Sequence, residues 1–174
     1  MENQAPISDS QANHRAMRVA AHLGSIPELT RLLNAGVSIN AQDQSSFDAT
    51  PLIAAAAKGH LEVVDFLLHQ GANVNLSESG GETALWWAIK GFHQAVVLRL
   101  LAAGADPNVK DEVGETALMW AVELGQEAIV PALLQAGAKV NAKSRKGKTA
   151  WFLALASERL DIAKMLDNAG ATDF

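Results

Sequence analysis

Apolar positions along the chain fall into short clusters with helical spacing. Segments of about eight residues, such as 51–58 and 61–69, place Ala, Val and Leu at helical rather than alternating positions. Isolated helices shorter than about 12–15 residues are marginal in water. These segments must therefore be stabilised by packing against neighbouring segments, and the pattern predicts an all-α protein built from stacked helices.

The pattern also repeats every 33 residues. Three residue types recur at this interval: Thr50, Thr83, Thr116 and Thr149; Ala55, Ala88, Ala121 and Ala154; and Gly71, Gly104, Gly137 and Gly170. A fixed period of this length indicates a repeat protein. The small Ala in each first helix predicts close helix packing, and the Gly after each second helix predicts a residue with positive φ. Gly59 and Gly125 are expected to end first helices, as is Gly91 one residue early in its copy.

The repeated segments resemble the ankyrin repeat. Segments such as ATPLIAAAAKGHLEVVDFLLHQGANVN and ETALMWAVELGQEAIVPALLQAGAKVN are similar to its T-P-L-H-x-A-A start, its G-H, its Leu-Leu and its closing G-A-x-V-N, over about residues 15–174. The resemblance implies an ankyrin-repeat solenoid of helix-turn-helix units with projecting β-hairpin-like loops. We expect a flexible polar tail at 1–12 and a single domain at 13–174, complete and without a second domain. Its five copies are predicted at about 13–44, 45–77, 78–110, 111–143 and 144–174.

The first and last copies depart from the pattern, as terminal capping repeats do. Arg15 stands where Thr is expected, and Asp167 replaces the second Leu of the last copy. The first copy is 35 residues from the second, so the first hairpin is expected to carry two extra residues. Pro131 lies inside the second helix of the fourth copy and should kink or shorten it.

Composition excludes several kinds of chemistry. The 174 residues contain no Cys, which excludes disulfides, Cys-ligated metals and a cysteine nucleophile. The formal net charge of −5 is the wrong sign for a protein that binds duplex nucleic acid through phosphates. Residues 1–16 lack the apolar core of a secretory signal, and no apolar run is long enough to cross a bilayer. We expect a cytoplasmic protein without membrane contact.

The sequence contains no convincing catalytic, metal or cofactor motif. His60 and His93 occupy the Gly-His position of the resemblance, where His is ordinarily structural, and no HExxH pair is present. Gly147-Lys148-Thr149 matches the end of a phosphate-binding loop, but Ala142 stands where that motif needs Gly. The repeat frame already explains these residues as a hairpin turn. We expect no enzyme activity, no metal and no cofactor.

The first helices are unusually aromatic. Where the family prefers His, the copies carry Ile53, Trp86, Met119 and Phe152, and the next position holds Ala54, Trp87, Trp120 and Leu153. In the family's architecture, inner helices and hairpin tips form a concave face on which partners usually dock. Trp is enriched at binding hot spots. Trp87 and Trp120 are therefore candidate surface residues and Trp86 a core residue, although the Trp side chains could instead only fill space between helices.

Two neighbouring hairpins carry opposite charge. The hairpin between the third and fourth copies contains Asp106, Asp111, Glu112 and Glu115, and the next contains Lys139, Lys143, Arg145, Lys146 and Lys148. The two could form a dipolar docking surface, or they could pair with each other or remain solvated, with little effect on stability. The candidate partner-binding residues are Phe47, Trp87, Lys90, Glu112, Val113, Glu115, Trp120, Glu123, Leu124, Arg145, Lys146 and Lys148.

Two functional hypotheses follow. The first is a non-catalytic protein-interaction module, a monomer when free, that scaffolds, masks or regulates a folded partner protein through the concave face and the hairpin tips. The second is a sensor of a small ligand or nucleotide. In that case Trp87 and Trp120 would stack on a planar group while Lys90 or Lys148 met a phosphate.

Overall fold

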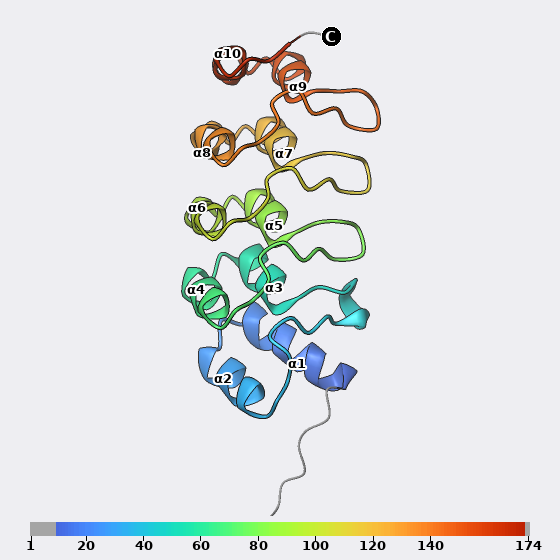
Figure 1. Cartoon of the computed structure of the whole chain (residues 1–174), viewed down its shortest axis with the longest axis vertical. Coiled ribbons are helices and arrows are strands. Elements are labelled where there is room, and N and C mark those ends of the chain that lie inside the picture. Colours follow the sequence, from blue (N-terminus) through green and yellow to red (C-terminus); the bar gives the residue numbers. More distant parts are fainter. Residues whose placement is uncertain (1–9, 173–174) are drawn as a thin grey trace, which may run out of the picture.

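The computed structural model describes residues 10–172. Within this range the chain forms five helix pairs stacked along one axis, with loops projecting from one side (Figure 1). The helices are α1 (Gln11–His22), α2 (Ile26–Asn34), α3 (Pro51–Lys58), α4 (Leu61–His69), α5 (Ala84–Lys90), α6 (Gln94–Ala102), α7 (Ala117–Glu123), α8 (Val130–Gln135), α9 (Ala150–Ala156) and α10 (Leu160–Asn168), with short 3₁₀ turns η1 (Gln44–Ser46) and η2 (Glu127–Ile129). The predicted all-α repeat solenoid is confirmed.

The repeated Thr residues explain where the inner helices begin. Thr50 accepts a hydrogen bond from the backbone N–H of Ile53 at 3.2 Å, and Thr149 accepts one from Phe152 at 3.1 Å. Thr83 does the same more weakly, at 3.4 Å from Trp86. A side-chain oxygen at this position satisfies one of the N–H groups that a helix start leaves without a partner. These three Thr residues thus fix the junction between a hairpin and its inner helix, whereas the buried Thr116 makes no such bond at the start of α7.

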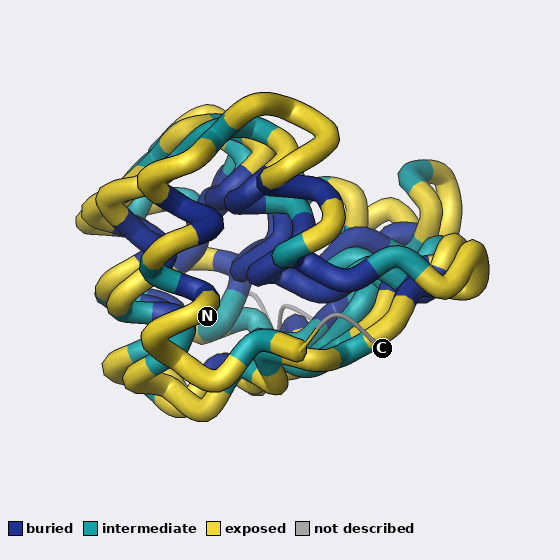
Figure 2. Tube along the Cα trace, turned by 90° about the horizontal axis from the view of Figure 1, so that it is seen from above, coloured by how far each residue is buried: buried dark blue, intermediate teal, exposed yellow. Residues whose placement is uncertain are grey.

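The repeated Ala residues allow the inner helices to pack closely. Ala55, Ala88, Ala121 and Ala154 are fully buried where α3, α5, α7 and α9 pack on their neighbours. Buried residues form a continuous band through the inside of the stack, whereas hairpin tips and outer turns are exposed (Figure 2). The apolar content is therefore distributed over successive thin interfaces, as expected of a one-dimensional stack.

The turns follow the predicted glycine pattern, including the early end of α5 at Gly91. Gly71, Gly104, Gly137 and Gly170 all have positive φ, between 84° and 88°. Gly59 and Gly125 also have positive φ where the first helices end, but Gly91 has φ −81°. The left-handed residue in that copy is Phe92, with φ 58°. The backbone requires a left-handed residue at a fixed place in the turn, so Gly91, one position early, does not supply it.

Asparagine side chains link each copy to the next. The amide of Asn108 donates to the carbonyl oxygen of Gly137 at 3.0 Å, and its oxygen accepts from the N–H of Lys139 at 2.8 Å. Asn75 and Asn141 make the same pair of bonds one copy earlier and one copy later. These bonds satisfy backbone groups at the end of each outer helix and set the distance between copies.

The hairpins are joined in a row by backbone hydrogen bonds. The N–H of Ser79 donates to the carbonyl of Phe47 at 2.8 Å, and that of Arg145 donates to the carbonyl of Val113 at 3.0 Å. Glu112 makes the corresponding bond to Gly80 at 3.0 Å. The first hairpin contains η1, and its backbone bond from Asp43 to Ala49 encloses two residues more than the later hairpins do, as predicted.

The ends of the stack differ partly from expectation. Helix α1 already begins at Gln11, inside the predicted tail, and residues 1–9 of that tail lie outside the described residues. Pro131 lies in the first turn of α8, and a separate 3₁₀ turn, η2, precedes it, so the predicted shortening is confirmed. In the last copy Asp167 is exposed, but Phe152 and Leu155 are also 49% and 40% exposed. The last copy is thus polar on only part of its outer face.

Candidate functional site

The candidate site is the inner face. We define it as the exposed side of α1, α3, α5, α7 and α9 together with the hairpins at 43–49, 78–82, 111–115 and 144–148. Hairpins and inner helices meet along one side of the stack (Figure 1). Because each hairpin leads through a buried Thr directly into an inner helix, the side chains of successive copies lie in register along this face.

Three tryptophans form one cluster in the middle of the inner face. The Trp86 ring lies 5.0 Å from that of Trp87 and 5.1 Å from that of Trp120, edge-to-face in both cases. Trp86 is only 8% exposed, which confirms its predicted place in the core, whereas Trp87 and Trp120 are half-buried. Trp86 therefore fills the space between the two outer rings and supports both of them.

Hydrogen bonds hold the two outer rings in place. The indole N–H of Trp87 donates to Glu78 at 3.1 Å, and that of Trp120 donates to Asp111 at 2.8 Å. Glu78 and Asp111 occupy the same position of consecutive hairpins, 33 residues apart. Each ring is thus tied to the base of the hairpin that precedes its helix. Rings fixed in this way lose little conformational entropy when a partner packs on them.

Lys90 covers part of the Trp cluster. Its Nζ atom lies 4.6 Å from the centre of the Trp86 ring and 4.8 Å from that of Trp87. A cation over an aromatic face at an exposed site contributes roughly 0.5–1 kcal/mol. Lys90 is exposed at the end of α5, so its charge remains available on the inner face beside Trp87.

An open hollow lies beside Trp87. It has a volume of about 300 Å³, an apolar floor and charged groups around it. The floor and wall are formed by Ala49, Ile53, Ala54, Ala57 and Trp87, and the surrounding polar residues are Arg18, His22, Ser46, Lys58 and Glu78. Ala54 occupies the position that holds Trp87 and Trp120 in the next two copies. The hollow therefore exists because a small residue lies next to a large one.

The charged groups around the hollow differ in whether an opposite charge balances them. Arg18 is paired with the buried carboxylate of Asp43 at 2.7 Å, so its charge is largely balanced. Burial raises the pKa of Glu78, with a further rise from Glu82, while the Trp87 N–H and Lys90 act in the opposite direction. Within the described structure Lys58 forms no ion pair and is exposed. It is thus an uncompensated positive charge beside an apolar floor.

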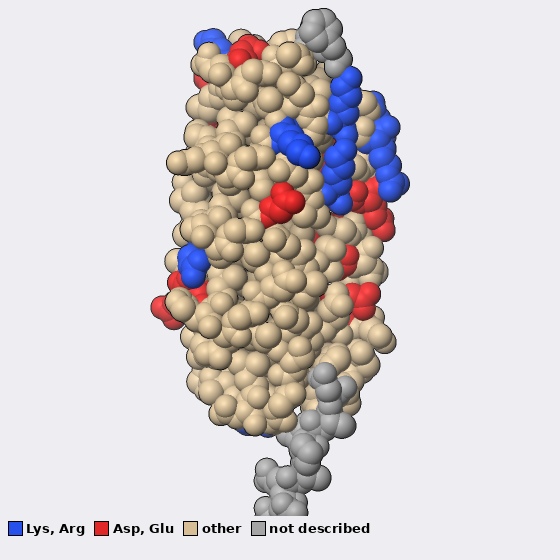
Figure 3. Space-filling model, in the orientation of Figure 1, with Lys and Arg blue, Asp and Glu red and all other residues tan. Residues whose placement is uncertain are grey.

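The oppositely charged hairpins do not pair with each other. Among the described residues, the ion pairs are Arg18–Asp43, Arg31–Glu28, Arg99–Asp65 and Lys164–Asp161, none of which joins two hairpins. Lys and Arg side chains gather at the last hairpin, with Asp and Glu directly beside them (Figure 3). Burial raises the pKa of Glu115, and the nearby carboxylates of Glu123 and Asp111 raise it further, while Lys148 and Lys146 act in the opposite direction without forming an ion pair. The charges are therefore left free to face solvent or a partner.

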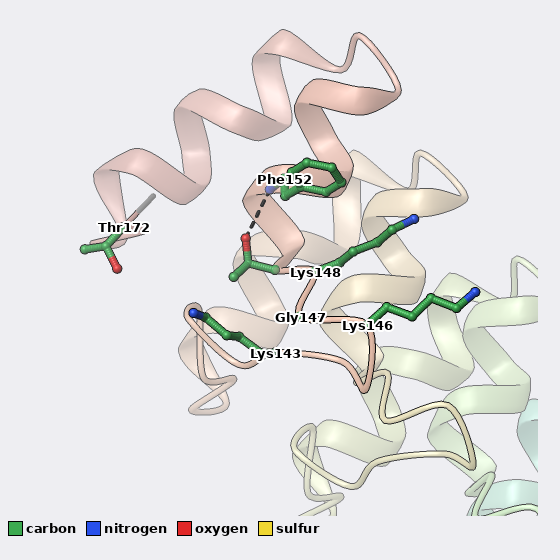
Figure 4. Close-up of a pocket in the computed structure, with 7 residues that line it drawn as sticks. Lys143, Lys146, Gly147, Lys148, Phe152 and Thr172 are labelled. Atoms are coloured by element: carbon green, nitrogen blue, oxygen red, sulfur yellow. Dashed lines mark hydrogen bonds between the residues drawn. The ribbon is translucent and has the colours of Figure 1, made fainter. Parts of the chain in front are cut away.

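A second hollow, of about 270 Å³, lies at the last hairpin. It is lined by Lys143, Lys146, Gly147, Lys148, Thr149, Phe152 and Thr172. Lys146 and Lys148 extend to the same side of the hairpin, whereas Lys143 extends to the opposite side (Figure 4). Lys148 Nζ lies 5.9 Å from the centre of the Phe152 ring. This hollow combines positive charge with an exposed aromatic surface.

The remaining predicted contact residues lie at the edges of the inner face. Phe47 is 76% exposed in the first hairpin, in a left-handed conformation, and Val113 is exposed at the tip of the hairpin 111–115. Glu123 and Leu124 lie at the other end of α7, and Leu124 packs partly against the core. Neither Phe47 nor Leu124 lines the hollow beside Trp87.

The histidines of the Gly-His positions have the structural role that was predicted. His60 donates to the carbonyl oxygen of His22 at 3.0 Å, and His93 donates to that of Ala57 at 3.2 Å. Each bond joins one copy to the last turn of the inner helix before it. In the described part of the chain, no three His, Cys, Asp or Glu side chains are placed to hold a metal ion, and no helix is long and apolar enough to cross a membrane.

Sequence reasoning missed the hollow and the residues that form it. Ala54 and Ala57 were not candidates because small apolar residues in a repeat helix normally indicate packing. The available signal was the contrast between Ala54 and the Trp residues at the same position of the next two copies. Arg18, His22 and Lys58 gave no comparable signal, because only the stacking of the copies brings them together.

Comparisons with known proteins agree with the fold. A family model described as "Ankyrin repeats (3 copies)" matches residues 16–111 and 92–173. The chain is 36% identical over 73 residues to the phosphocholine transferase AnkX of Legionella pneumophila, covering 42% of this chain and 8% of that protein. It is 33% identical over 67 residues to an ankyrin repeat-containing protein of Schizosaccharomyces pombe, covering 38% of this chain and 31% of that protein.

A third similarity is to a probable E3 ubiquitin-protein ligase of Oryza sativa, 50% identical over 44 residues, or 25% of this chain and 8% of that protein. The matched regions thus span 8–31% of the length of these relatives. The similarity supports a shared repeat and extends to no more than that part of each relative.

Proposed function

The chain belongs to the ankyrin-repeat family, and from this premise we propose that it is a non-catalytic module that binds a folded partner protein and thereby scaffolds, masks or regulates it. Repeats of this family generally mediate protein–protein interaction. The contact surface in this proposal is the inner face, with Trp87 and Trp120 at its centre and the charged hairpins at its edge.

The observation that carries this proposal is the hollow beside Trp87. An apolar floor of Ala and Ile next to a half-buried Trp offers a place for one apolar side chain of a partner. The ring of Trp87 is already fixed by Glu78, Trp86 and Lys90. Hot spots of protein interfaces have this form, an aromatic wall around a site that becomes fully desolvated on binding.

The charged groups around the hollow would orient the partner. Lys58 and Lys90 place two exposed positive charges near Trp87, so an acidic residue beside the partner's apolar anchor would be favoured. Electrostatic complementarity of this kind increases the association rate and selects among partners more than it adds to affinity.

The geometry gives less support to a small-ligand sensor. Stacking a planar group between Trp87 and Trp120 requires free space between the two rings, and Trp86 lies within about 5 Å of both. The hollow beside Trp87 and the hollow at the last hairpin are both open rather than enclosed, whereas small-molecule sites usually bury most of the ligand surface.

A substitution that fills the hollow tests the proposal. Ala54→Trp places in the second copy the residue found at the same position of the next two copies, so the fold is expected to accept it. The matched control is Ala95→Trp, which adds the same bulk on the exposed side of the outer helix α6. A partner isolated with the native chain from its own cells would be purified and titrated against all three proteins by calorimetry.

We expect the native chain and Ala95→Trp to bind this partner equally and Ala54→Trp to bind it at least tenfold more weakly. Circular dichroism would establish that all three proteins are folded. If folded Ala54→Trp binds the partner as tightly as the native chain does, the hollow is not the contact site and the proposal for this face fails.

A further inference from the structure

We propose that the last two hairpins bind an extended segment of the partner in which acidic and basic residues are separated. The acidic half lies on the hairpin at 144–148, and the basic half lies on the hairpin at 111–115. This inference rests on the proposed function and specifies the chemistry of the partner at the C-terminal part of the inner face.

The charges of the two hairpins are concentrated and unpaired. Residues 139–148 contain Lys139, Lys143, Arg145, Lys146 and Lys148 and no carboxylate. A sixth cation is close, because the Nζ of Lys110 donates to the carbonyl of Lys143 at 2.8 Å. The preceding hairpin holds Glu112, which is exposed, and Glu115, which is half-buried, and neither forms an ion pair in the described structure; Asp111 is buried and bonded to Trp120. Both surfaces therefore have charge available for a ligand.

Repeat register places the opposite charges directly across from each other. Glu112 and Arg145 occupy equivalent positions 33 residues apart, as do Glu115 and Lys148. The backbone bond from the Arg145 N–H to the Val113 carbonyl holds the two hairpins at a fixed separation. Packed helices lie about 8–10 Å apart, and an extended chain advances about 3.3 Å per residue. A ligand that crosses from one hairpin to the other must therefore change its charge within about three residues.

The hollow at the last hairpin adds an apolar contact on the acidic side of the ligand. Phe152 is half exposed, and Lys146, Lys148 and Phe152 all line the hollow (Figure 4). An apolar side chain next to the ligand's carboxylates would cover Phe152 while the carboxylates face the lysines. The matching segment thus contains an apolar residue within its acidic half.

A continuous polyanion fits this surface poorly. A strand of RNA that followed the row of hairpins would pass from the lysines onto Glu112 and Glu115 and then toward Glu78 and Glu82. The net charge of −5 adds a general repulsion. A segment with both signs of charge matches the two hairpins, whereas a segment with one sign matches only the last.

Two synthetic peptides of identical composition test the proposal. Both contain equal numbers of Asp and Lys around one Phe, so both have no net charge. In the first peptide the Asp residues and Phe occupy one half and the Lys residues the other; in the second the charges alternate. Fluorescence anisotropy with the full chain at low salt would compare their affinities. We expect at least tenfold tighter binding of the segregated peptide, and weaker binding as salt increases.

Charge-reversal variants locate the site. We expect Lys146→Glu with Lys148→Glu to reduce binding of the segregated peptide at least tenfold, and Glu112→Lys with Glu115→Lys to do the same. Combining all four substitutions should restore part of the binding, because the peptide can then lie in the opposite direction, although its Phe no longer covers Phe152. Lys164→Glu, a single charge reversal on the outer helix α10, should leave the affinity unchanged.

The outcomes distinguish this inference from the proposed function. Equal affinity for the two peptides, or tighter binding of a single-stranded RNA of similar length, would overturn the inference. So would failure of the fourfold variant to recover binding while its circular dichroism remains that of the native chain. In each case the Ala54→Trp experiment still decides independently whether the inner face binds a partner.

Discussion

Replacing Asn108 with Ala is expected to weaken the interface between the third and fourth copies. The substitution removes the hydrogen bonds from Asn108 Nδ2 to the Gly137 carbonyl and from the Lys139 N–H to Asn108 Oδ1, which measure 3.0 and 2.8 Å. A hydrogen bond contributes about 0.5–1.5 kcal/mol net to stability, so the pair contributes about 1–3 kcal/mol. Water can reach these backbone groups after the substitution, which favours a loss of about 1–2 kcal/mol.

Asn141 makes the equivalent pair of bonds, to the Gly170 carbonyl at 3.0 Å and from the Thr172 N–H at 2.9 Å. Its position differs, because it joins the last copy to the stack whereas Asn108 joins two inner copies. In a one-dimensional stack, stability is a sum of terms for single repeats and for neighbouring interfaces. Asn108→Ala should therefore lower the free energy of global unfolding, and Asn141→Ala should mainly free α9 and α10.

Urea unfolding followed by circular dichroism measures the free energy of global unfolding. Amide hydrogen exchange shows which copy is weakened. The control is Asn34→Ala, since the exposed Asn34 side chain makes no hydrogen bond in the described structure. The reasoning would be refuted if Asn108→Ala were as stable as Asn34→Ala. It would also be refuted if Asn141→Ala accelerated exchange equally in α3 and in α9, because the stack would then not respond copy by copy.

Three further substitutions test local features. Glu115→Gln should be more stable than the native chain at neutral pH, because burial, and then Glu123 and Asp111, raise the folded-state pKa of Glu115. The stability of the native chain therefore falls as pH rises from the unfolded-state pKa through this raised pKa. Urea titrations should show that the difference in stability vanishes below the ordinary Glu pKa, and equal stability at neutral pH would contradict the assignment. Phe92→Gly should raise the free energy of unfolding by up to about 1 kcal/mol, because only Gly adopts the left-handed conformation without strain. The reverse change at the equivalent position, Gly59→Ala, should lower the free energy of unfolding, because φ is +73° and the added Cβ atom would clash with the His93 ring. Thermal melts that ranked these two variants in the opposite order would refute this account.

Local features were predictable wherever one residue dictates its own conformation. The Ala and Gly series have the predicted roles in the structure, and three of the four repeated Thr residues cap an inner helix. Gly91 ends α5 one residue early, as predicted, but the sequence gives no reason to expect the next residue, Phe92, in the left-handed conformation. A residue-type pattern identifies the place of a turn more reliably than it identifies the residue that adopts positive φ in that turn.

Features of the inner face depended on neighbours from other copies. The sequence placed Trp87 and Trp120 at one position of consecutive copies, but only the structure shows Trp86 packed between them and each indole bonded to its hairpin. The hollow beside Trp87 likewise requires residues of three successive copies. Side-chain direction and the size of the facing residue decide such contacts, and neither is encoded in the period.

The sequence by itself determined the repeat, its length, the helix starts and the absence of cysteine chemistry, because each of these follows from a residue's own backbone preference or functional group. The tertiary structure alone decided that the opposite charges of neighbouring hairpins remain unpaired and that a small Ala opens a hollow beside a fixed Trp. These two outcomes depend on distances between side chains of different copies. Such distances are fixed only when the copies stack, and they are what gives this common fold a particular surface.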